Sequence, residues 1–197
     1  MSVTDAVLRT AGGSTIPLRL DRWRGEPETA ELMVLHDVTG PVIDLGCGPG
    51  RHTLALARRG IVVLGVDAAP TAVDVARGKG APVLHRSVFD ALPGEGRWAT
   101  ALLLDGNIGI GGDPVHLLRR ALELLAPGGA ALVELEGPGV KVERVRARVE
   151  RSGEHGPWFP WARVGVDALT ALAARAGFVA ESVSGIGGRW FARLRTA

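Results

Sequence analysis

The residues best suited to chemistry in this 197-residue chain form a glycine-rich turn behind an acidic residue. Asp44 is followed at every second position by a glycine, at Gly46, Gly48 and Gly50. Because glycine has no Cβ, the backbone can bend sharply here and approach a ligand closely. The apolar run before the turn and the helical period after it predict a strand, a loop and a helix. The N–H groups that open such a helix favour an anionic ligand group.

A second acidic residue, Asp67, ends the next apolar run, residues 61–66. In nucleotide-binding sheets, an acid about 20 residues beyond the glycines accepts hydrogen bonds from ribose hydroxyls. Asp67 has this spacing, although a helix N-cap or turn aspartate would also suit the following Ala68-Ala69-Pro70. Strand, glycine loop, helix, strand and acid together predict a nucleoside site.

The spacing of the glycines separates two kinds of nucleoside ligand. A dinucleotide site expects Gly-x-Gly-x-x-Gly, with a pyrophosphate in the loop. Here the third glycine comes one position earlier, and Asp44 would repel a pyrophosphate but suit a cationic ligand. Asp44 followed by Gly46, Gly48 and Gly50 resembles the first motif of the class I S-adenosylmethionine-dependent methyltransferases.

This resemblance implies S-adenosylmethionine as cofactor and S-adenosylhomocysteine as its product. It puts Asp44 near the methionyl amino end, the backbone of residues 46–50 near the methionyl part and ribose, and Asp67 on the ribose hydroxyls. Many relatives carry an acid near Ser87 that this chain lacks, so Asp90 or backbone groups would receive the adenine amino group. The full set of implied cofactor contacts is Asp44, Gly46, Cys47, Gly48, Gly50, His52, Asp67, Ala68, Ser87, Val88, Phe89, Asp105 and Asn107.

Candidate catalytic residues follow a buried strand predicted over residues 98–104. Parallel sheets bind ligands outside the carboxyl ends of their strands, which brings Asp105 and Asn107 beside the transferring methyl group. A sulfonium is already a good leaving group, so the enzyme mainly aligns a nucleophile and removes its proton where needed. Asp105 either serves the acceptor or contacts the methionyl end, and His116 is the first histidine to test as a base. The alternative bases are His36 and His155.

Aromatic and basic side chains outside the core are candidates for the acceptor site. Arg22 and Trp23 precede the first long helix, in a segment that commonly forms a lid in methyltransferases; simple packing is the alternative for Trp23. A hairpin predicted within residues 137–165 carries an aromatic cluster that either walls an apolar acceptor or covers the sheet edge. Phe89 has two readings as well, adenine packing or core. The predicted acceptor contacts are Arg22, Trp23, Asn107, Trp158, Phe159 and Trp161.

The predicted reaction is methyl transfer to an O or N nucleophile of a small, secondary metabolite, and other chemistries have less support in the sequence. Asp105 and Glu136 alone offer too few oxygens for a magnesium site, so no metal is predicted. The loop after residue 104 lacks the Asn/Asp-Pro-Pro-Tyr motif of enzymes that methylate nucleobase or glutamine amino groups. A protein that binds S-adenosylmethionine without transferring methyl is the alternative, and the glycine spacing disfavours a nicotinamide-dependent oxidoreductase.

The composition of the chain bears on its binding partners and on its cellular compartment. The net charge is +2, and the arginines are spread along the chain without the basic, aromatic stripes of nucleic-acid binders. The single cysteine, Cys47, cannot form an internal disulfide, and it lies where a small side chain packs well. No signal peptide or long apolar run is evident. We therefore expect a cytoplasmic protein without nucleic-acid or membrane partners, whose oligomeric state the sequence does not indicate.

The predicted fold is α/β, a single Rossmann-like methyltransferase domain. Its mainly parallel, seven-stranded sheet has an antiparallel last strand, helices on both faces and a small β-hairpin insertion. The resemblance covers residues 28–136. The predicted parts are an N-terminal lid and helix segment (1–40), a cofactor-binding core (41–136), the hairpin (137–165) and a closing helix with strands (166–197).

The start of two helices is predicted from proline and acidic residues. Pro27 and the acids after it predict a helix to residue 37, with Leu32, Met33 and Leu35 in the core. Asp113 followed by proline predicts the N-cap of a second helix.

Overall fold

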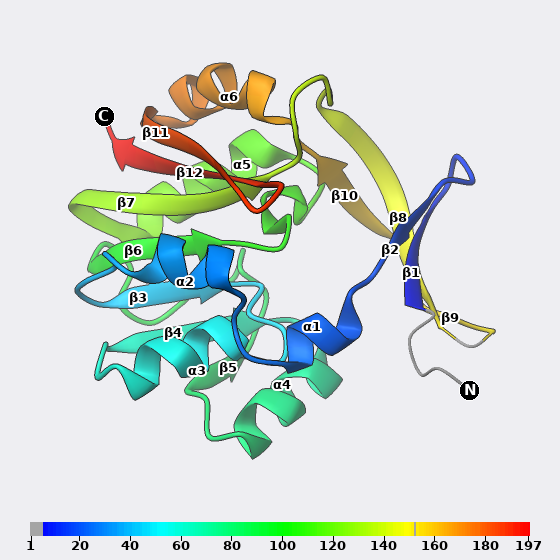
Figure 1. The fold of residues 1–197 in the computed structure, drawn as a ribbon, viewed down its shortest axis with the longest axis horizontal. Coiled ribbons are helices and arrows are strands. Elements are labelled where there is room, and N and C mark those ends of the chain that lie inside the picture. The colour runs from blue at the N-terminus through cyan, green and yellow to red at the C-terminus, as the bar shows by residue number, and fades with distance from the viewer. Residues whose placement is uncertain (1–5, 152) are drawn as a thin grey trace.

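A computed structural model describes residues 6–151 and 153–197. Its centre is a seven-stranded sheet in the order β11-β12-β7-β6-β3-β4-β5 (Figure 1). The strands from β5 to β7 pair in parallel, whereas β12 runs antiparallel to both β7 and β11. This confirms the predicted mainly parallel sheet with its last strand antiparallel. The bounds are β3 (Val42–Leu45), β4 (Val63–Asp67), β5 (Val83–His85), β6 (Trp98–Leu103), β7 (Leu125–Leu135), β11 (Phe178–Ile186) and β12 (Arg189–Thr196).

Helices cover both faces of this sheet because its central strands are apolar on both sides. α2 (Thr29–Leu35) and α3 (Arg51–Arg58) share one core cluster with Leu102 and Leu104. The alternate residue Leu103 joins the opposite cluster, which includes side chains of α5 (Pro114–Leu124) and α6 (Leu169–Ala176). α4 (Pro70–Gly78) connects β4 to β5, and a 3₁₀ turn η2 (Val166–Ala168) leads into α6. Within the described residues, no helix combines the length and hydrophobicity needed to cross a membrane.

The first long helix is shorter than predicted and turns a different face to the core. Leu35 is buried as expected, but Leu32 and Met33 are 51% and 58% exposed, so the prediction is wrong for both. Residues four apart share a helix face, and Glu31 is therefore buried together with Leu35. Glu28 and Glu31 form a capping box at the start of this helix.

The second helix begins as predicted. The side chain of Asp113 accepts hydrogen bonds from the backbone N–H groups of Val115 and His116, at 3.1 and 3.3 Å. Pro114 takes the first helical position, where its missing N–H has no intrahelical partner to lose. Asp113 is therefore confirmed as a structural N-cap.

The order of the strands determines where a ligand can bind. From β3 the chain continues outward to β4 and β5, and β6 then returns to the other side of β3. A sheet that reverses in this way opens a crevice at the carboxyl ends of the strands on either side of the reversal. The residues that follow β3, β4 and β6 are thus brought to one edge of the sheet.

A second, antiparallel sheet stands beside that edge. Its order is β10-β8-β1-β2, with β9 paired to β8, and Figure 1 shows it opposite the arrowheads of the central strands. The predicted hairpin strands are β8 and β10, but β8 also pairs with β1 along residues 6–10, which the sequence did not predict. The short helix α1 (Leu20–Arg24) leaves this sheet toward the crevice. The bounds are β1 (Ala6–Thr10), β2 (Thr15–Pro17), β8 (Glu143–Arg151), β9 (Glu154–His155) and β10 (Phe159–Arg163).

Candidate functional site

The glycine loop between β3 and α3 has the backbone that the sequence predicted. Gly46, Gly48 and Gly50 have φ angles of 79°, 53° and 80°, which residues with a Cβ rarely adopt. A Cβ on Gly46 would lie 2.7 Å from the Asn107 side chain, and one on Gly50 would lie 3.0 Å from Ala76. A Cβ on Gly48 would instead meet no atom within 4 Å. The side of Gly48 on which a Cβ would stand is therefore open, which leaves room for a ligand against this loop.

Asp67, at the end of β4, is bonded to this loop. Its Oδ2 accepts a hydrogen bond from the backbone N–H of Gly48, and its Oδ1 accepts one from Ala69, both at 2.8 Å. An ionised carboxylate has about four acceptor positions, so both oxygens can accept a further bond. Asp67 therefore stabilises the local turn, as the sequence allowed. Its carboxylate can still accept hydrogen bonds from ribose hydroxyls.

Asp44 and Cys47 are buried beside the loop. Asp44 is 1% exposed, and its Oδ2 accepts a hydrogen bond from the hydroxyl of Thr53 on α3 at 2.7 Å. Burial raises the pKa of Asp44. Burial, and then the charges of Asp44 and Asp67, also raise the pKa of the Cys47 thiol far above its ordinary value. Cys47 is thus an inert packing residue, and the contact of Asp44 with a methionyl amino group stays a prediction.

The segment after β5 presents one aromatic ring at the surface. Phe89 is 36% exposed, and its ring lies 5.0 Å from that of His116 and against Gly111. The core interpretation of Phe89 is therefore wrong. Val88 belongs to the core, and its predicted contact with the cofactor stays a prediction. Ser87 is half-buried, and its hydroxyl accepts the N–H of Phe89 at 3.2 Å. The exposed Ala68 lies next to Asp67.

Asn107 connects the end of β6 to the glycine loop. It begins the 3₁₀ turn η1 (Asn107–Gly109), and its side-chain amide donates to the carbonyl oxygens of Leu45 and Gly46, at 3.0 and 2.8 Å. Both loops that follow the two central strands are thereby held in one arrangement.

The Asp105 carboxylate belongs to a cluster of charged side chains. Arg51 Nη2 lies 2.6 Å from both of its oxygens, and Arg22 Nη2 lies 3.3 Å from Oδ1. Since guanidinium groups engage both oxygens, the geometry favours a role in binding or positioning over proton removal. The predicted catalytic role of Asp105 is not tested by these contacts and stays a prediction.

Glu31 lies at the centre of this cluster, and the sequence analysis missed it. Its Oε1 is 2.8 Å from Arg22, 2.5 Å from Arg51 and 2.8 Å from Arg189. Burial alone would raise the pKa of Glu31, but the neighbouring His52 and Arg22 outweigh it and hold the pKa well below its ordinary value. The one available signal was the spacing of Glu31 four residues before the apolar Leu35.

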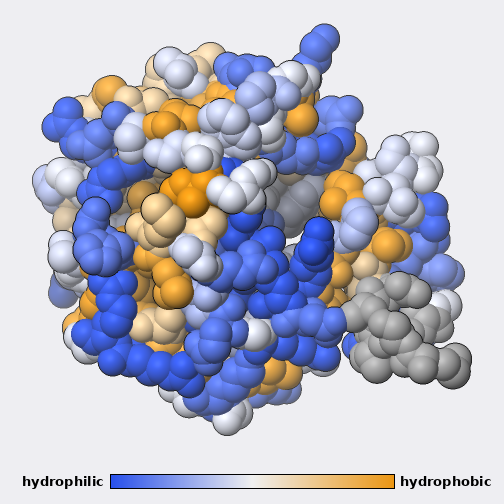
Figure 2. All heavy atoms as spheres, in the orientation of Figure 1, coloured by the Kyte–Doolittle hydropathy of each residue, from blue (hydrophilic) through white to orange (hydrophobic). Residues whose placement is uncertain are grey.

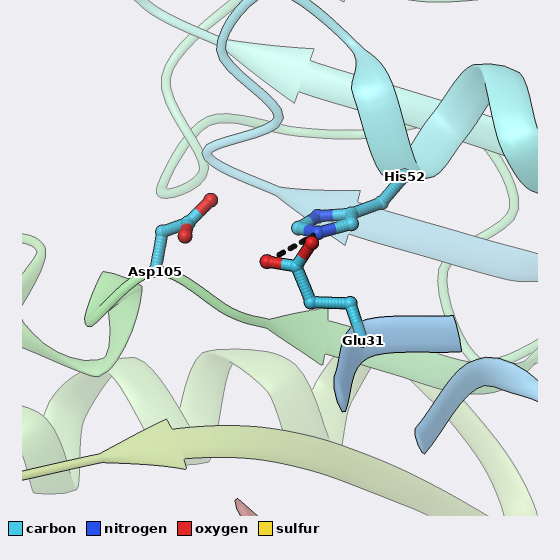
Figure 3. A group of neighbouring side chains, drawn as sticks. All are labelled: Glu31, His52 and Asp105. Atoms are coloured by element: carbon cyan, nitrogen blue, oxygen red, sulfur yellow. Dashed lines mark ion pairs between the residues drawn. The ribbon is translucent and has the colours of Figure 1, made fainter. Parts of the chain in front are cut away.

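Glu31, His52 and Asp105 each point a possible metal ligand toward the others, within 4.8 Å (Figure 3). His52 Nε2 lies 3.4 Å from Glu31 Oε1, so His52 is buried against the acid rather than open to the crevice. The guanidinium groups around Glu31 and Asp105 compete with a cation for both carboxylates. Glu136, the other acid considered for a metal, accepts two bonds from Arg163, at 2.7 and 2.5 Å.

The aromatic cluster of the second sheet divides between its two faces. Trp161 bridges to Ile110, and its ring lies so close to Gly109 that a Cβ there would be 2.9 Å away. Phe159 lies on the same side, its ring 6.2 Å from that of Trp161. Trp158 instead packs under the Arg148 guanidinium, with 4.8 Å between them, and does not join the other two rings.

Figure 2 shows a hollow between the two sheets, bordered by hydrophilic side chains toward the central sheet and by apolar ones toward the second sheet. Arg22 lies in the charged cluster on the hydrophilic side, and Trp23 is half-buried on α1. His116 is exposed beside Phe89. Hydrogen bonds join Asp67 to Gly48 and Asn107 to Gly46 at this edge of the sheet, whereas contact of any predicted residue with a donor or an acceptor stays a prediction.

This sheet order, the glycine loop after β3 and the acid after β4 define the fold of the class I S-adenosylmethionine-dependent methyltransferases. Residues 42–129 match the family described as "Methyltransferase domain". The chain thus has the fold of these methyltransferases, and its core, residues 42–129, is similar to a methyltransferase domain.

Among solved structures, the chain resembles an S-adenosylmethionine-dependent methyltransferase from Bacteroides fragilis in complex with S-adenosylhomocysteine. The TM-score is 0.80 at 25% identity, over 98% of this chain and 89% of that one. The 1,6-didemethyltoxoflavin N1-methyltransferase of Burkholderia thailandensis shares the fold, with a TM-score of 0.62 and 21% identity over 90% of this chain and 80% of that one.

Among curated proteins, trans-aconitate 2-methyltransferase from Methylobacterium radiotolerans is 33% identical over 66% of this chain and 50% of its own length. A 2-heptyl-1-hydroxyquinolin-4(1H)-one methyltransferase from Mycobacteroides abscessus is 45% identical over 27% of this chain and 23% of its own length. The chain thus spans about a quarter to a half of these two relatives.

Proposed function

We propose that this protein transfers a methyl group from S-adenosylmethionine to an O or N nucleophile of a small metabolite. The observation that carries the proposal is the open face of Gly48, bonded to a carboxylate with acceptor capacity to spare. A nucleoside laid across this loop would find backbone at the methionyl side and Asp67 at its ribose. The donor would supply an activated methyl group on a positively charged sulfur.

The chain's own residues would bind and orient the donor. Asp67 would accept bonds from the ribose hydroxyls, while Asn107 holds the loop after β3 in place. The carboxyl groups of the buried Asp44 and the half-buried Asp105 would favour a cationic ligand at the methionyl end. Phe89, Ser87 and Ala68 would border the adenine.

We place the acceptor in the hollow between the sheets (Figure 2). We propose that the rings of Trp161 and Phe159, which lie 6.2 Å apart, form its apolar wall. Such a wall suits a flat, partly apolar molecule, since small-molecule pockets are usually apolar with few polar groups. The names of two relatives, a hydroxyquinolone and a didemethyltoxoflavin methyltransferase, support an acceptor of this kind. The name of a third relative, acting on trans-aconitate, supports a small molecule more generally.

His116 is the proposed base where the acceptor must lose a proton. It is exposed at the start of α5, with its ring 5.0 Å from that of Phe89. His36 pairs with Asp37 and His155 lies near Glu150, each on an exposed part of the surface, so both are weaker candidates.

We further propose a cytoplasmic setting without nucleic-acid or membrane partners.

Methyl transfer from labelled S-adenosylmethionine into a metabolite extract tests this function. The proposal expects label in one or a few small molecules, and loss of that label in an Asp67→Ala variant. If donor binds but no extract accepts label, the alternative of a non-catalytic S-adenosylmethionine-binding protein would hold instead.

A further inference from the structure

Asp105 has an unusual backbone for a residue with a side chain. Its φ is 57°, and in the described part of the chain it is the one non-glycine residue with a positive φ. Aspartate tolerates the left-handed region better than most residues, but the conformation remains disfavoured. Contacts with the rest of the protein must therefore hold the turn in this shape.

The backbone of Asp105 is held by an ion pair on the neighbouring strands. Its N–H donates to Glu134 Oε2 on β7 at 2.7 Å. Arg189, the first residue of β12, clamps Glu134 with two bonds: Nε to Oε1 at 2.8 Å and Nη2 to Oε2 at 2.6 Å. A planar guanidinium that bonds both oxygens fixes the direction of the carboxylate. Arg189 thereby orients the group that receives the Asp105 N–H.

The side chain of Asp105 is held by the same set of charges. Arg51 bonds both of its oxygens, and Arg189 Nη2 lies 3.7 Å from Oδ1. Glu31 Oε1 contacts both arginines, which keeps the two guanidinium groups in register. Side chains from α2, α3, β7 and β12 thus converge on one strained turn.

The turn at Asp105 positions the glycine loop that is proposed to bind the cofactor. Asn107, two residues farther along, bonds the carbonyl oxygens of Leu45 and Gly46. We propose that Arg189, acting through Glu134, is a positioning residue for the cofactor site: it holds Asp105 in its left-handed conformation and Asn107 against the glycine loop. This inference rests on the proposed use of S-adenosylmethionine.

The test is the variant Arg189→Lys, which keeps the charge but loses the planar fork. Calorimetric titration with S-adenosylhomocysteine is expected to show a Kd roughly tenfold higher than that of the wild type, the effect of one lost charge-assisted hydrogen bond. The KM for S-adenosylmethionine should rise by the same factor, with kcat changed much less. The matched control is Arg193→Lys, also on β12, whose exposed pair with Glu181 at 2.8 Å lies outside the cluster; its Kd should equal that of the wild type.

A second variant, Glu134→Gln, keeps an oxygen that can accept the Asp105 N–H and is nearly the same size. The neutral side chain cannot hold the Arg189 guanidinium as the carboxylate does, so the Kd for S-adenosylhomocysteine should rise severalfold. This variant decides the question if Arg189→Lys does not fold. An unchanged Kd in a folded Arg189→Lys or, failing that, in Glu134→Gln overturns the inference, as does an equal rise in Arg193→Lys. Wild-type protein that binds no S-adenosylhomocysteine would instead contradict the proposed function.

Discussion

The backbone N–H of Gly48 donates a hydrogen bond of 2.8 Å to the Oδ2 of Asp67. This bond joins the loop after β3 to the end of β4, so the two parts of the predicted nucleoside site are also partners of each other. A ligand that bonds both would find them already oriented.

Replacing Asp67 by alanine should weaken nucleoside binding, because it removes the ribose acceptor and releases the Gly48 N–H. Losing hydrogen bonds to a charged group costs about 1.5–3 kcal/mol each, so the Kd for S-adenosylhomocysteine should rise at least about tenfold. Calorimetry measures it. Asp74→Ala, an exposed acid on α4, is the control and should bind like the wild type. An unchanged Kd in Asp67→Ala would remove the cofactor assignment.

Gly48→Ala separates backbone strain from blockage of the site. Gly48 and Gly60 both have a positive φ and no atom within 4 Å of an added Cβ, but Gly60 ends α3 at the opposite edge of the sheet. Both alanine variants should therefore lose a similar stability, about 1 kcal/mol, in denaturant unfolding. Only Gly48→Ala should lose affinity for S-adenosylhomocysteine, since its methyl group enters the cradle. Equal affinity in the two variants would speak against this loop as the binding surface.

Glu31→Gln should destabilise the fold strongly, because it leaves three arginines around a buried neutral group. Breaking a buried ion pair typically costs about 3–5 kcal/mol. Glu26→Gln, which breaks the exposed pair with Arg58, should cost less than about 1 kcal/mol. Urea unfolding at neutral pH compares the two, and a similar small loss in both would contradict the central place given to Glu31.

The lowered pKa of Glu31 also predicts that the stability of the fold decreases on acidification. Its pKa is held below the ordinary value of 4.5, so the folded state binds this proton more weakly than the unfolded state. The stability that Glu31 contributes is fully present above about pH 4.5 and is lost as the pH falls below it. The difference in unfolding free energy between the wild type and Glu31→Gln should therefore shrink on acidification, whereas a constant difference would argue against the ion cluster.

Trp161→Ala and Trp158→Ala form a matched pair on opposite faces of the second sheet. Trp161 lies against Gly109, in the turn that follows β6, whereas Trp158 lies under Arg148 and is 38% exposed. Once an acceptor is known, Trp161→Ala should raise its KM roughly tenfold, because stacking on an aromatic ring contributes about 0.5–1.5 kcal/mol beyond the area buried. Trp158→Ala should leave the KM unchanged. The opposite ranking would move the acceptor to the other face.

Local patterns predicted the central sheet and the cofactor loop well, since both depend on residues close in sequence. The glycine loop, Asp67 at the end of β4 and the Asp113 cap follow from backbone geometry and hydrogen bonding within a few residues. The phase of α2 was mistaken because apolar side chains alone do not tell which face meets the core.

The charged cluster could not be predicted because its members come from distant parts of the chain. Glu31 and Arg51 lie on different helices, and Arg189 belongs to β12, so only the tertiary fold brings them together. Pairing of β1 with β8 escaped prediction for the same reason. Long-range contacts of this kind leave no local pattern.

We propose that the crevice beside Gly48 and Asp67 binds the methyl donor. Isothermal titration of the wild-type protein with S-adenosylmethionine, S-adenosylhomocysteine and NAD tests it most directly. We expect saturable binding of both sulfur nucleosides, about one per chain, and no measurable binding of NAD. Binding of NAD without S-adenosylhomocysteine, or of none of the three, would contradict it.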